Sequence, residues 1–523
     1  MDSDDCAARR GWYNRHFSRR KFIAGAAGLS AGAVVGGQLP TTAYAAPEGG
    51  LHGAELRGMY LTSKDRLAEG RFGLMFKKLP AFAPPDRLLD DLASKMVEPD
   101  TSNTFLARQG ENLFAGFTFI GQFIDHDITL DTTPLSLQQS DPDATTNFRT
   151  PRYDLDSVYG KGPGTEPQFY DPADKDKLLV RPNGNKTADG KDVLDMLRDS
   201  NGRAIIPERR NDENLIIVQF HKAVAQFHNA IVDYVRSTGM RREWVFETAR
   251  RLTRWHYQWA VIHDFIPRFV GDGLVPSGTV YKEVAGKPPV INLNYYKPTN
   301  REGRPFMPVE FAVAAYRFGH SLIRPFYVIN DSGTVDIFGT NSESRNLNGG
   351  RPIPSDLVIE WKNILPNLGF DGARPPRKID TKLSIPLTQL PGSAVPPPDP
   401  TIHLAVRNNR RGKQVGLPSG QQVAKAMRVT ALSNTQLELD SSWGEAPLWY
   451  YILKEAEVLH EGQLLGPVGG RIMAETLVGL LQRDPNSYLY LDPSWKPAPP
   501  IAPETGKFEF ADLLTFAGAA KRS

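Results

Sequence analysis

Two long segments of helical periodicity lie close together in the middle of the chain, and they constrain its fold most. In 214–235, "NLIIVQFHKAVAQFHNAIVDYV", apolar residues recur every three or four positions, which is typical of a helix with one buried face. The segment 241–263 has the same pattern, and Pro267 predicts where that helix closes. Further helical patterns occupy 113–130, 307–325, 421–430 and 470–482. Because clear strand alternation is scarce, the sequence predicts a mainly α-helical protein.

Long loops separate the predicted helices. Residues 131–205 are dense in Asp, Pro and Gly, and 390–400, "LPGSAVPPPDP", predicts a stiff loop. The chain has 523 residues, enough to bury a large core, and it contains no internal repeat. We therefore expect one large domain over 111–520 with little β-structure, preceded by a loop-rich extension at 46–110. A division into two smaller domains is the alternative.

Charge and cysteine content exclude several classes of protein. The formal net charge is +3, and the chain has no lysine-rich face or tail, so nothing indicates a nucleic-acid partner. Its single cysteine is Cys6, which excludes an intramolecular disulfide and a metal site built from several thiolates.

The N-terminal residues have the pattern of an export signal. The twin arginines of "SRRKFI" (18–23) precede an uncharged run of small residues, and Ala43-Tyr44-Ala45 offers a cleavage site. A membrane anchor is the alternative, but the run is short and rich in glycine for a spanning helix. We expect a twin-arginine signal at 1–45 and a secreted or periplasmic protein with no stable membrane anchor. That route carries folded proteins, which suits a protein that acquires its cofactor before export.

One polar cluster interrupts the apolar helix predicted over 113–130, within "GQFIDHDIT" (121–129). Gln122 and His126 are four residues apart and share one helix face. Asp125 lies beside that face, and Asp127 points away from it. Such side chains are costly to bury unless each has a partner. They are either satisfied core residues or parts of a site.

Two further clusters have equally plain structural explanations when taken alone. Arg210 and Glu213 stand three residues apart where the long helix begins, a place where acidic residues are common because the helix dipole favours them. In "YRFGHSLIRP", His320 follows Arg317 by about one turn, with Gly319 beside it. A small residue next to a buried histidine lets a large planar group approach, whereas a core histidine bonded to a carbonyl is the simpler alternative.

Together, the three clusters resemble motifs of the animal-type haem peroxidases, in the peroxidase–cyclooxygenase superfamily. "GQFIDHDIT" is similar to the family's distal-haem helix, "RRNDENLIIVQFH" to its catalytic-arginine segment, and "FAVAAYRFGHSLIRP" to its proximal-haem helix. They occur in the family's order, and the resemblance covers roughly residues 110–430. It implies the large haem peroxidase fold, in a bacterial secreted member.

The resemblance implies a role for each polar residue near the haem. His126 would be the distal base that moves a proton between the two oxygens of hydrogen peroxide. Arg210 would be the distal cation that polarises the O–O bond. Gln122 would line the same cavity, and His320 would be the axial ligand to the haem iron.

The cofactor expected from the resemblance is haem b. Asp125 and Glu213 match positions that form ester bonds to haem methyl groups in some members. Where other members have a haem-linked methionine, this chain has Asn214, so no sulfonium link is expected. Arg317 would lie beside the haem, near a propionate. The acceptor for the second nitrogen of His320 is an asparagine in the family, and Gln421 in "VGLPSGQQV" is the residue we match to it.

A calcium site next to the distal helix is also implied by the resemblance. The loop "TPRYDLDS" (150–157) resembles the family's calcium loop, and Ca²⁺ prefers hard oxygen ligands of this kind. A solvated, Asp-rich loop is the alternative. The candidate ligands are Asp127, Thr150, the carbonyl of Arg152, Asp154 and Asp156.

Three functions compete. The first is a haem peroxidase that reduces hydrogen peroxide and oxidises small organic donors or halides. The second is a fatty-acid dioxygenase of the same superfamily, which uses a tyrosine three residues before the proximal histidine. Here that position is Arg317, and Tyr316, one place off, is expected to point elsewhere. The third is a non-catalytic secreted haem-binding protein, which the presence of all three key residues disfavours.

Overall fold

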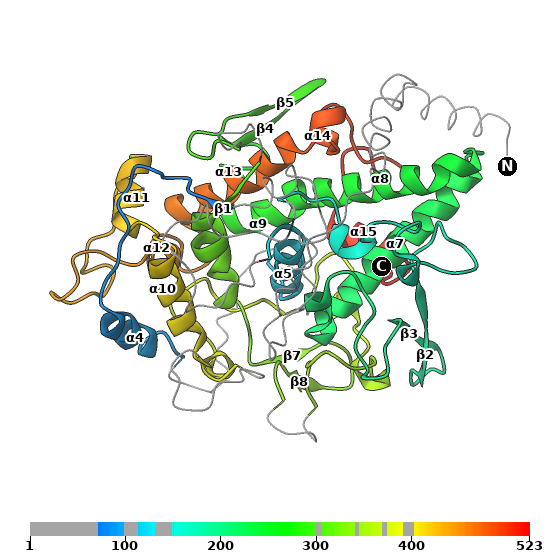
Figure 1. Cartoon of the computed structure of the whole chain (residues 1–523), viewed down its shortest axis with the longest axis horizontal. Helices are drawn as coiled ribbons and strands as arrows, with labels where there is room; N and C mark the ends of the chain where they lie inside the picture. Colours follow the sequence, from blue (N-terminus) through cyan, green and yellow to red (C-terminus); the bar gives the residue numbers. More distant parts are fainter. Residues whose placement is uncertain are drawn as a thin grey trace, which may run out of the picture.

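The computed structural model describes most of the chain after the predicted signal. The described residues are 72–98, 113–130, 149, 151–298, 305–339, 345–368, 374–390 and 402–522. The predicted signal at 1–45 and nearly all of the loop predicted at 390–400 lie outside them. Within the described residues the protein is mainly α-helical, which confirms the predicted fold class (Figure 1).

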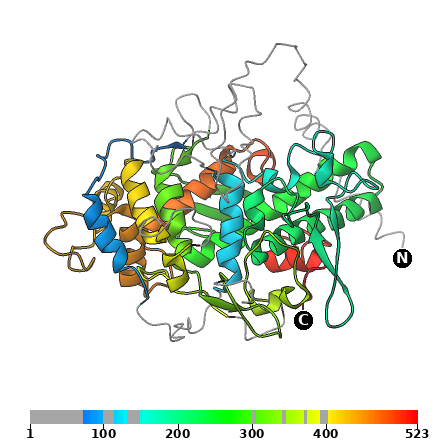
Figure 2. The same ribbon diagram turned by 60° about the horizontal axis from the view of Figure 1, so that its bottom comes forward.

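Helix α5 (Gly116–Ile128) lies in the middle of the molecule, between two groups of helices (Figure 1, Figure 2). On one side are α7 (Leu215–Ser237) and α8 (Arg242–Ala260), which pack against each other. The other side holds α4 (Asp86–Ser94), α10 (Leu404–Gln414), α11 (Gly420–Met427), α12 (Leu448–His460) and α13 (Pro467–Arg483). The remaining helices are α6 (Asp156–Tyr159), α9 (Ile266–Val270), α14 (Tyr488–Leu491) and α15 (Phe510–Phe516).

The strands of the described residues form four separate two-stranded sheets, so β-structure does not build the core. The only parallel pair among them joins β1 (Phe72–Gly73) to β6 (Met307–Pro308). Three antiparallel hairpins complete the set: β2 (Val180–Lys186) with β3 (Asp192–Met196), β4 (Tyr281–Val284) with β5 (Lys287–Ile291), and β7 (Phe326–Val328) with β8 (Thr334–Asp336).

Aromatic packing holds α5 between its neighbours. Phe123 is fully buried, and its ring meets Phe220 of α7 and Tyr257 of α8 edge-on, with centroids 5.0 Å and 6.0 Å apart. Helix α7 begins where Asn214 accepts hydrogen bonds from the backbone N–H groups of Ile216 and Ile217. Buried apolar residues at helical spacing explain why periodicity alone located both helices, and α7 also has a capped start.

The helix predicted over 241–263 does not close at Pro267. It continues through a π-helical turn (Val261–Phe265) into α9 and ends at Gly271, which has a φ of 70°. Pro267 occupies the first turn of α9, where the N–H that proline lacks is less needed. The prediction that the helix ends at Pro267 was wrong because the π-helical turn leads into a new helix, in which the proline falls in the first turn.

The helix predicted over 307–325 is also irregular. After β6 the chain forms a π-helical turn (Glu310–Ala314) and then a 3₁₀ helix (Ala315–His320). Glu310 is fully buried, and its carboxylate accepts the backbone N–H groups of Met75 and Phe76, each at 2.9 Å. This anchor fixes the first turn, and the change of helix type alters which side chains face α5.

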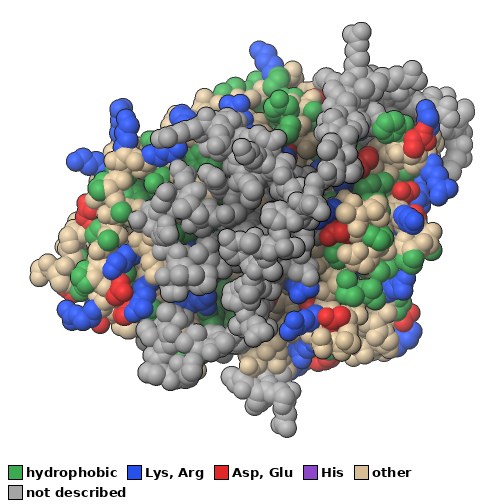
Figure 3. All heavy atoms as spheres, viewed as in Figure 1, with side chains coloured by type: hydrophobic (Ala, Val, Ile, Leu, Met, Phe, Trp, Pro, Cys, Tyr) green, Lys and Arg blue, Asp and Glu red, His purple; other side chains and the backbone are tan. Residues whose placement is uncertain are grey.

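Charged side chains of both signs are interspersed over the described surface on the face that Figure 3 shows. Among the described residues, no helix is both long enough and apolar enough to cross a membrane.

Candidate functional site

Three polar side chains converge between α5 and the start of α7. The Gln122 amide donates to Glu213 Oε1 at 2.5 Å, and His126 Nε2 lies 3.5 Å from the same oxygen. The other ring nitrogen of His126, Nδ1, lies 2.9 Å from Asn211 Oδ1. His126 is only 4% exposed. The structure thus brings together Gln122, His126 and Glu213, of which the spacing predicts only that Gln122 and His126 share a helix face.

Burial is the main reason why the pKa of His126 is lowered. The neighbouring Arg210 guanidinium lowers it further, whereas the carboxylates of Glu213, Glu208 and Asp125 act in the opposite direction. A lowered pKa keeps the imidazole neutral near pH 7, which is the form that accepts a proton.

Arg210 lies in a short 3₁₀ helix (Arg209–Asp212) and reaches the end of α5. Its Nη2 group donates to the carbonyl oxygens of His126 and Thr129, at 3.1 Å and 2.6 Å. Nη2 and Nε also donate to the Glu208 carboxylate, at 3.0 Å and 3.2 Å. These bonds hold the guanidinium beside His126, and Nη1 takes no part in them.

Glu208 links two arginines in the protein interior. Its carboxylate also accepts from Nε of Arg149 at 2.9 Å, and Arg149 in turn donates to Asp156 at 2.7 Å. Burial alone would raise the pKa of Glu208, but the two guanidinium groups outweigh it and hold that pKa well below its usual value. Glu208 therefore stays charged and fixes Arg210. The sequence analysis does not predict this role, although Glu208 stands only two residues before Arg210.

Asp125 does not join the cluster around Glu213. Its carboxylate accepts from the Thr129 hydroxyl at 2.9 Å, and the side chain is partly exposed. Asn214 donates weakly to Gln122 Oε1 at 3.5 Å while it caps α7. Asp125 thus faces a different side of α5 from Gln122 and His126.

His320 ends the 3₁₀ helix that approaches α5 from the other side, and its partner is Asn408 rather than Gln421. The Asn408 amide nitrogen lies 2.8 Å from His320 Nδ1. Gln421 instead donates to Asn434 at 3.2 Å and accepts from the N–H of Ala446 at 2.8 Å. The prediction of Gln421 was wrong because α10, not α11, brings a carboxamide to the histidine.

Asn408 could have been found from the sequence. Asn is a poor helix former, and two in succession (Asn408 and Asn409) interrupt the helical segment "LAVRNNRRGKQ". Both are buried, each 2% exposed. A buried asparagine inside a helix needs a hydrogen-bond partner, and here that partner is His320.

Arg317 lies on the same side as His320. Its Nη1 group is 3.5 Å from Asn408 Oδ1, and its Nε donates to the Ala312 carbonyl at 3.1 Å. Burial, with the charges of Arg317 and Arg407, lowers the pKa of His320 to about 3. The imidazole is therefore neutral, as metal ligation requires.

The space beside His320 is open. A methyl group placed on Gly319 would meet nothing within 4 Å, and both residues are partly exposed in this protein-only structure. Since Asn408 occupies Nδ1, the ring nitrogen left for a ligand is Nε2. A neutral imidazole next to open space, with Arg317 nearby, fits an iron porphyrin with acidic side chains.

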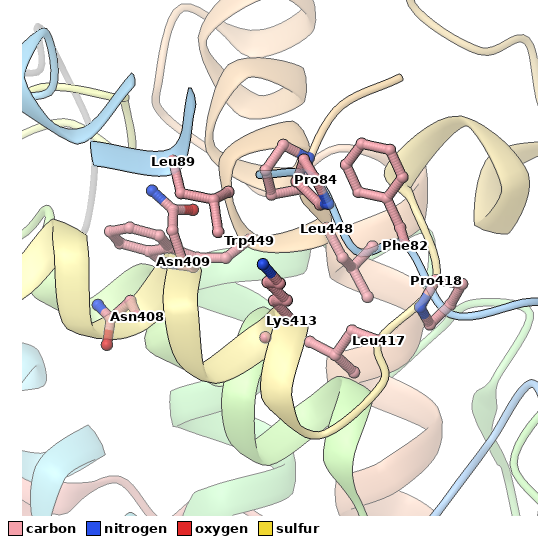
Figure 4. Close-up of a pocket in the computed structure, with 12 residues that line it drawn as sticks. Phe82, Pro84, Leu89, Asn408, Asn409, Lys413, Leu417, Pro418, Leu448 and Trp449 are labelled. Atoms are coloured by element: carbon pink, nitrogen blue, oxygen red, sulfur yellow. The ribbon is translucent and has the colours of Figure 1, made fainter. Parts of the chain in front are cut away.

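A cavity lined in part by α10, including Asn408, does not provide such space. It is lined by Phe82, Pro84, Leu89, Asn409, Lys413 and Trp449 among others (Figure 4). Its volume is about 10 Å³, room for about one water molecule. It therefore suits neither a cofactor nor a substrate.

The sequence predicts that Tyr316 points away from the site, but in the structure its side chain reaches α5. Its hydroxyl donates to the carbonyl of Gly121 on α5 at 3.1 Å, and the ring is 8% exposed. Gly121 and Asp125 are one turn apart on the same face of α5. Burial, and secondly the Asp125 charge, raises the pKa of this tyrosine. The irregular helix at 310–320 turns Tyr316 toward α5.

Three carboxylates meet on the opposite side of α5. Each of Asp127, Asp154 and Asp156 offers an oxygen within 4.8 Å of those of the other two. Asp127 is fully buried and accepts from the Ser157 hydroxyl at 2.7 Å. Burial and the two neighbouring charges raise its pKa well above the usual value. Thr150 lies outside the described residues, and Arg152 is in the same loop.

Comparisons with known proteins give the family and the fold of the chain. Residues 132–442, more than half of the chain, match the animal haem peroxidase family, a range that includes Arg210, Glu213, His320 and Asn408. No curated protein sequence shows significant similarity to the chain.

Two solved structures have a similar fold. Peroxidase A from Dictyostelium discoideum has a TM-score of 0.55 at 15% identity, over 86% of this chain and 92% of that one. The fatty acid alpha-dioxygenase of Arabidopsis thaliana has a TM-score of 0.52 at 14% identity, over 85% of this chain and 78% of that one. At such low identity the two likenesses show the fold alone. It is the match over residues 132–442 that places the chain in the animal haem peroxidase family.

Proposed function

We propose that the protein is a haem-dependent peroxidase, which reduces hydrogen peroxide and oxidises small organic donors or halides. The observation that carries the proposal is the cluster at α5. A neutral His126 has its Nε2 beside Gln122 and Glu213, and the fixed cation of Arg210 is next to it. When bound, haem b would supply the iron that binds peroxide and stores the oxidising power.

His320 is the residue we assign to the haem iron, through Nε2. Asn408 orients its ring, Gly319 leaves space beside it, and Arg317 is close enough to meet a propionate. Asp125 and Glu213 would lie along the haem edge, where ester bonds to the porphyrin are a further proposal.

The distal residues have complementary roles in the proposed reaction. With haem bound, His126 Nε2 would take a proton from one oxygen of hydrogen peroxide and return it to the other, which would leave as water. The charge of Arg210 stabilises the negative charge that develops on the leaving oxygen. The Gln122 amide donates to Glu213, which holds that carboxylate beside His126.

Replacing the two histidines separates haem binding from peroxide chemistry. We expect His320→Ala to lose stable haem binding, seen as loss of the Soret band. His126→Ala should retain the band but react with hydrogen peroxide about 10²–10⁴-fold more slowly, the share that a general base contributes. The exposed His460, changed to alanine, is the control and should alter neither property. A wild-type peroxide rate in His126→Ala would refute the distal assignment.

A fatty-acid dioxygenase is the second candidate, and the position of Tyr316 favours it. The hydroxyl reaches α5 one turn from Asp125, close to the proposed haem edge. Fatty-acid-dependent oxygen uptake that is lost in Tyr316→Phe, without peroxidase turnover, would identify this activity. Haem binding with neither activity would instead indicate a non-catalytic haem protein.

Calcium is the cation we propose for Asp127, Asp154 and Asp156. Arg149 already pairs with Asp156, but the charges of Asp154 and Asp156 still raise the pKa of the buried Asp127, and Ca²⁺ takes oxygen ligands of this kind. The carbonyl of Arg152 and the side chain of Thr150 are proposed to complete the site.

A further inference from the structure

Asn211 lies between two buried histidines and is itself fully buried. Its Oδ1 is 2.9 Å from Nδ1 of His126, and its Nδ2 is 3.1 Å from Nδ1 of His221. His221 comes from α7 and is 1% exposed. One carboxamide thus joins the proposed distal base to a second imidazole on another helix.

The hydrogen-bonding capacity of these groups restricts where protons lie. Nδ2 of a carboxamide can only donate, so Nδ1 of His221 must be the acceptor and carry no proton. Burial lowers the pKa of His221 to about 3, which keeps it neutral. Oδ1 of Asn211 can only accept, so Nδ1 of His126 must carry its proton. Nε2 of His126 is then the nitrogen with the free lone pair.

The short helix that bears Asn211 is fixed on both sides, so the carboxamide has a defined direction. Asp212 accepts two hydrogen bonds from Arg198, at 2.7 Å and 2.9 Å, and one from the N–H of Ala204 at 2.8 Å. Glu208 holds Arg210 on the other side. What these anchors do not determine is which end of the amide faces His126.

We propose that Asn211 is a positioning residue that keeps the proton of His126 on Nδ1, and that His221, by accepting from Nδ2 of Asn211, holds the amide in this orientation. If the amide turned over, its Nδ2 would face His126 and require a bare Nδ1. The proton of His126 would then be on Nε2, where the base must be free to accept one. The inference rests on the proposed function, in which Nε2 of His126 is that base.

Asn211 variants test the first half of the proposal on the haem-loaded protein. We expect Asn211→Leu to lower the rate of reaction with hydrogen peroxide by at least about tenfold, which is part of the roughly 10²–10⁴-fold that a general base contributes. Asn211→Asp retains an acceptor for Nδ1–H, so it should stay much closer to the wild-type rate. Equal losses in the two variants would overturn the positioning role.

His221 variants test the second half against a matched control. His221→Phe removes the acceptor that orients the amide, and His221→Gln restores one, so the Phe variant should be slower and the Gln variant partly rescued. His256→Phe is the control, because His256 is equally buried and bonds only a backbone carbonyl, that of Leu252 at 2.7 Å. If both Phe variants behave alike, His221 has only a packing role.

A direct measurement of the tautomer separates this inference from the proposed function. In the ferrous, carbon-monoxide-bound protein labelled with ¹⁵N-histidine, NMR reports which ring nitrogen carries the proton. We expect Nδ1–H at His126 in the wild type and Asn211→Asp, and a mixture or Nε2–H in Asn211→Leu and His221→Phe. The same tautomer in every variant would overturn the inference. A protein with the expected tautomers but no peroxide reaction would refute only the proposed function.

Discussion

The hydrogen bond between Asn408 and His320 shows how a single residue can set the orientation and basicity of the proposed haem ligand. Outer partners of metal-bound histidines orient the ring and raise its basicity, and losing one commonly costs 10–100-fold in metal affinity or activity. In this structure Nδ2 of Asn408 faces Nδ1 of His320 and Oδ1 faces Arg317, so the amide would have to turn over to accept a proton from Nδ1 in the haem-bound protein. Arg317, 3.5 Å from the same amide, makes this pair part of a larger polar group.

Asn408→Leu should therefore weaken haem binding by about 10–100-fold and make the iron easier to reduce, because the histidine becomes a poorer donor. The measurements are haem affinity by Soret titration and the midpoint potential of the iron. Gln421→Leu is the matched control, since its partners are Asn434 and Ala446, and it should leave both properties unchanged. The reverse result, with the larger change in Gln421→Leu, would contradict the contact seen here.

At the scale of elements, α5 carries a different polar function on each face. Gln122 and His126 face Glu213, Asp125 and Gly121 face Tyr316, and Asp127 faces the loop at 154–157. Helix geometry makes this division unavoidable for residues at these spacings. A cation bound by Asp127 would therefore stabilise the same helix that positions the proposed base.

Removing that cation should destabilise the protein. If calcium is present at about 100 times its dissociation constant, exhaustive chelation should cost about 2.7 kcal/mol and lower the melting temperature. Added calcium should restore it in the wild type but not in Asp154→Asn. The exposed Asp189, changed to asparagine, is the control and should behave as wild type. Unchanged melting and activity after chelation would exclude the site.

The elements also show which predictions a sequence can support. The helices at 113–130 and 214–235 follow from local periodicity, because apolar residues recur at helical spacing along both and are buried. The segment 307–325 has the same apolar content, yet Glu310 is tied to Met75 and Phe76 more than 230 residues away. No local sequence pattern predicts these hydrogen bonds of Glu310. The π and 3₁₀ turns that follow Glu310 direct Tyr316 toward α5.

At the scale of the whole molecule, the site depends on segments that are distant in the sequence. The resemblance assigns His126 and Glu213 to one site, but it does not include Asn211, which is 85 residues from His126 in the sequence. The partner of His320 could not be predicted, because choosing between Asn408 and Gln421 requires knowing that α10 is the helix that faces the 3₁₀ turn. The role of Glu208 could not be predicted either, because it depends on a hydrogen bond from Arg149, 59 residues earlier in the sequence.

Export of the folded protein is a proposal about the whole chain. We expect the change of Arg19 and Arg20 to lysine to retain haem-loaded protein in the cytoplasm of a bacterial host, because the twin-arginine pair is what the export machinery reads. The measurement is the distribution of Soret absorbance between cell fractions. The control is Arg9→Lys, Arg10→Lys, which keeps the motif intact. Equal export of both variants would refute the signal.

The bonds of Arg210 to the carbonyls of His126 and Thr129 have a consequence for recognising relatives. This guanidinium closes the end of α5 whether or not peroxide is ever bound. A descendant that lost its catalytic activity would still be under selection to keep the arginine for folding. Its presence in a distant sequence is therefore a weak diagnostic of activity, and an intact His126 with its asparagine neighbour is the more informative signature.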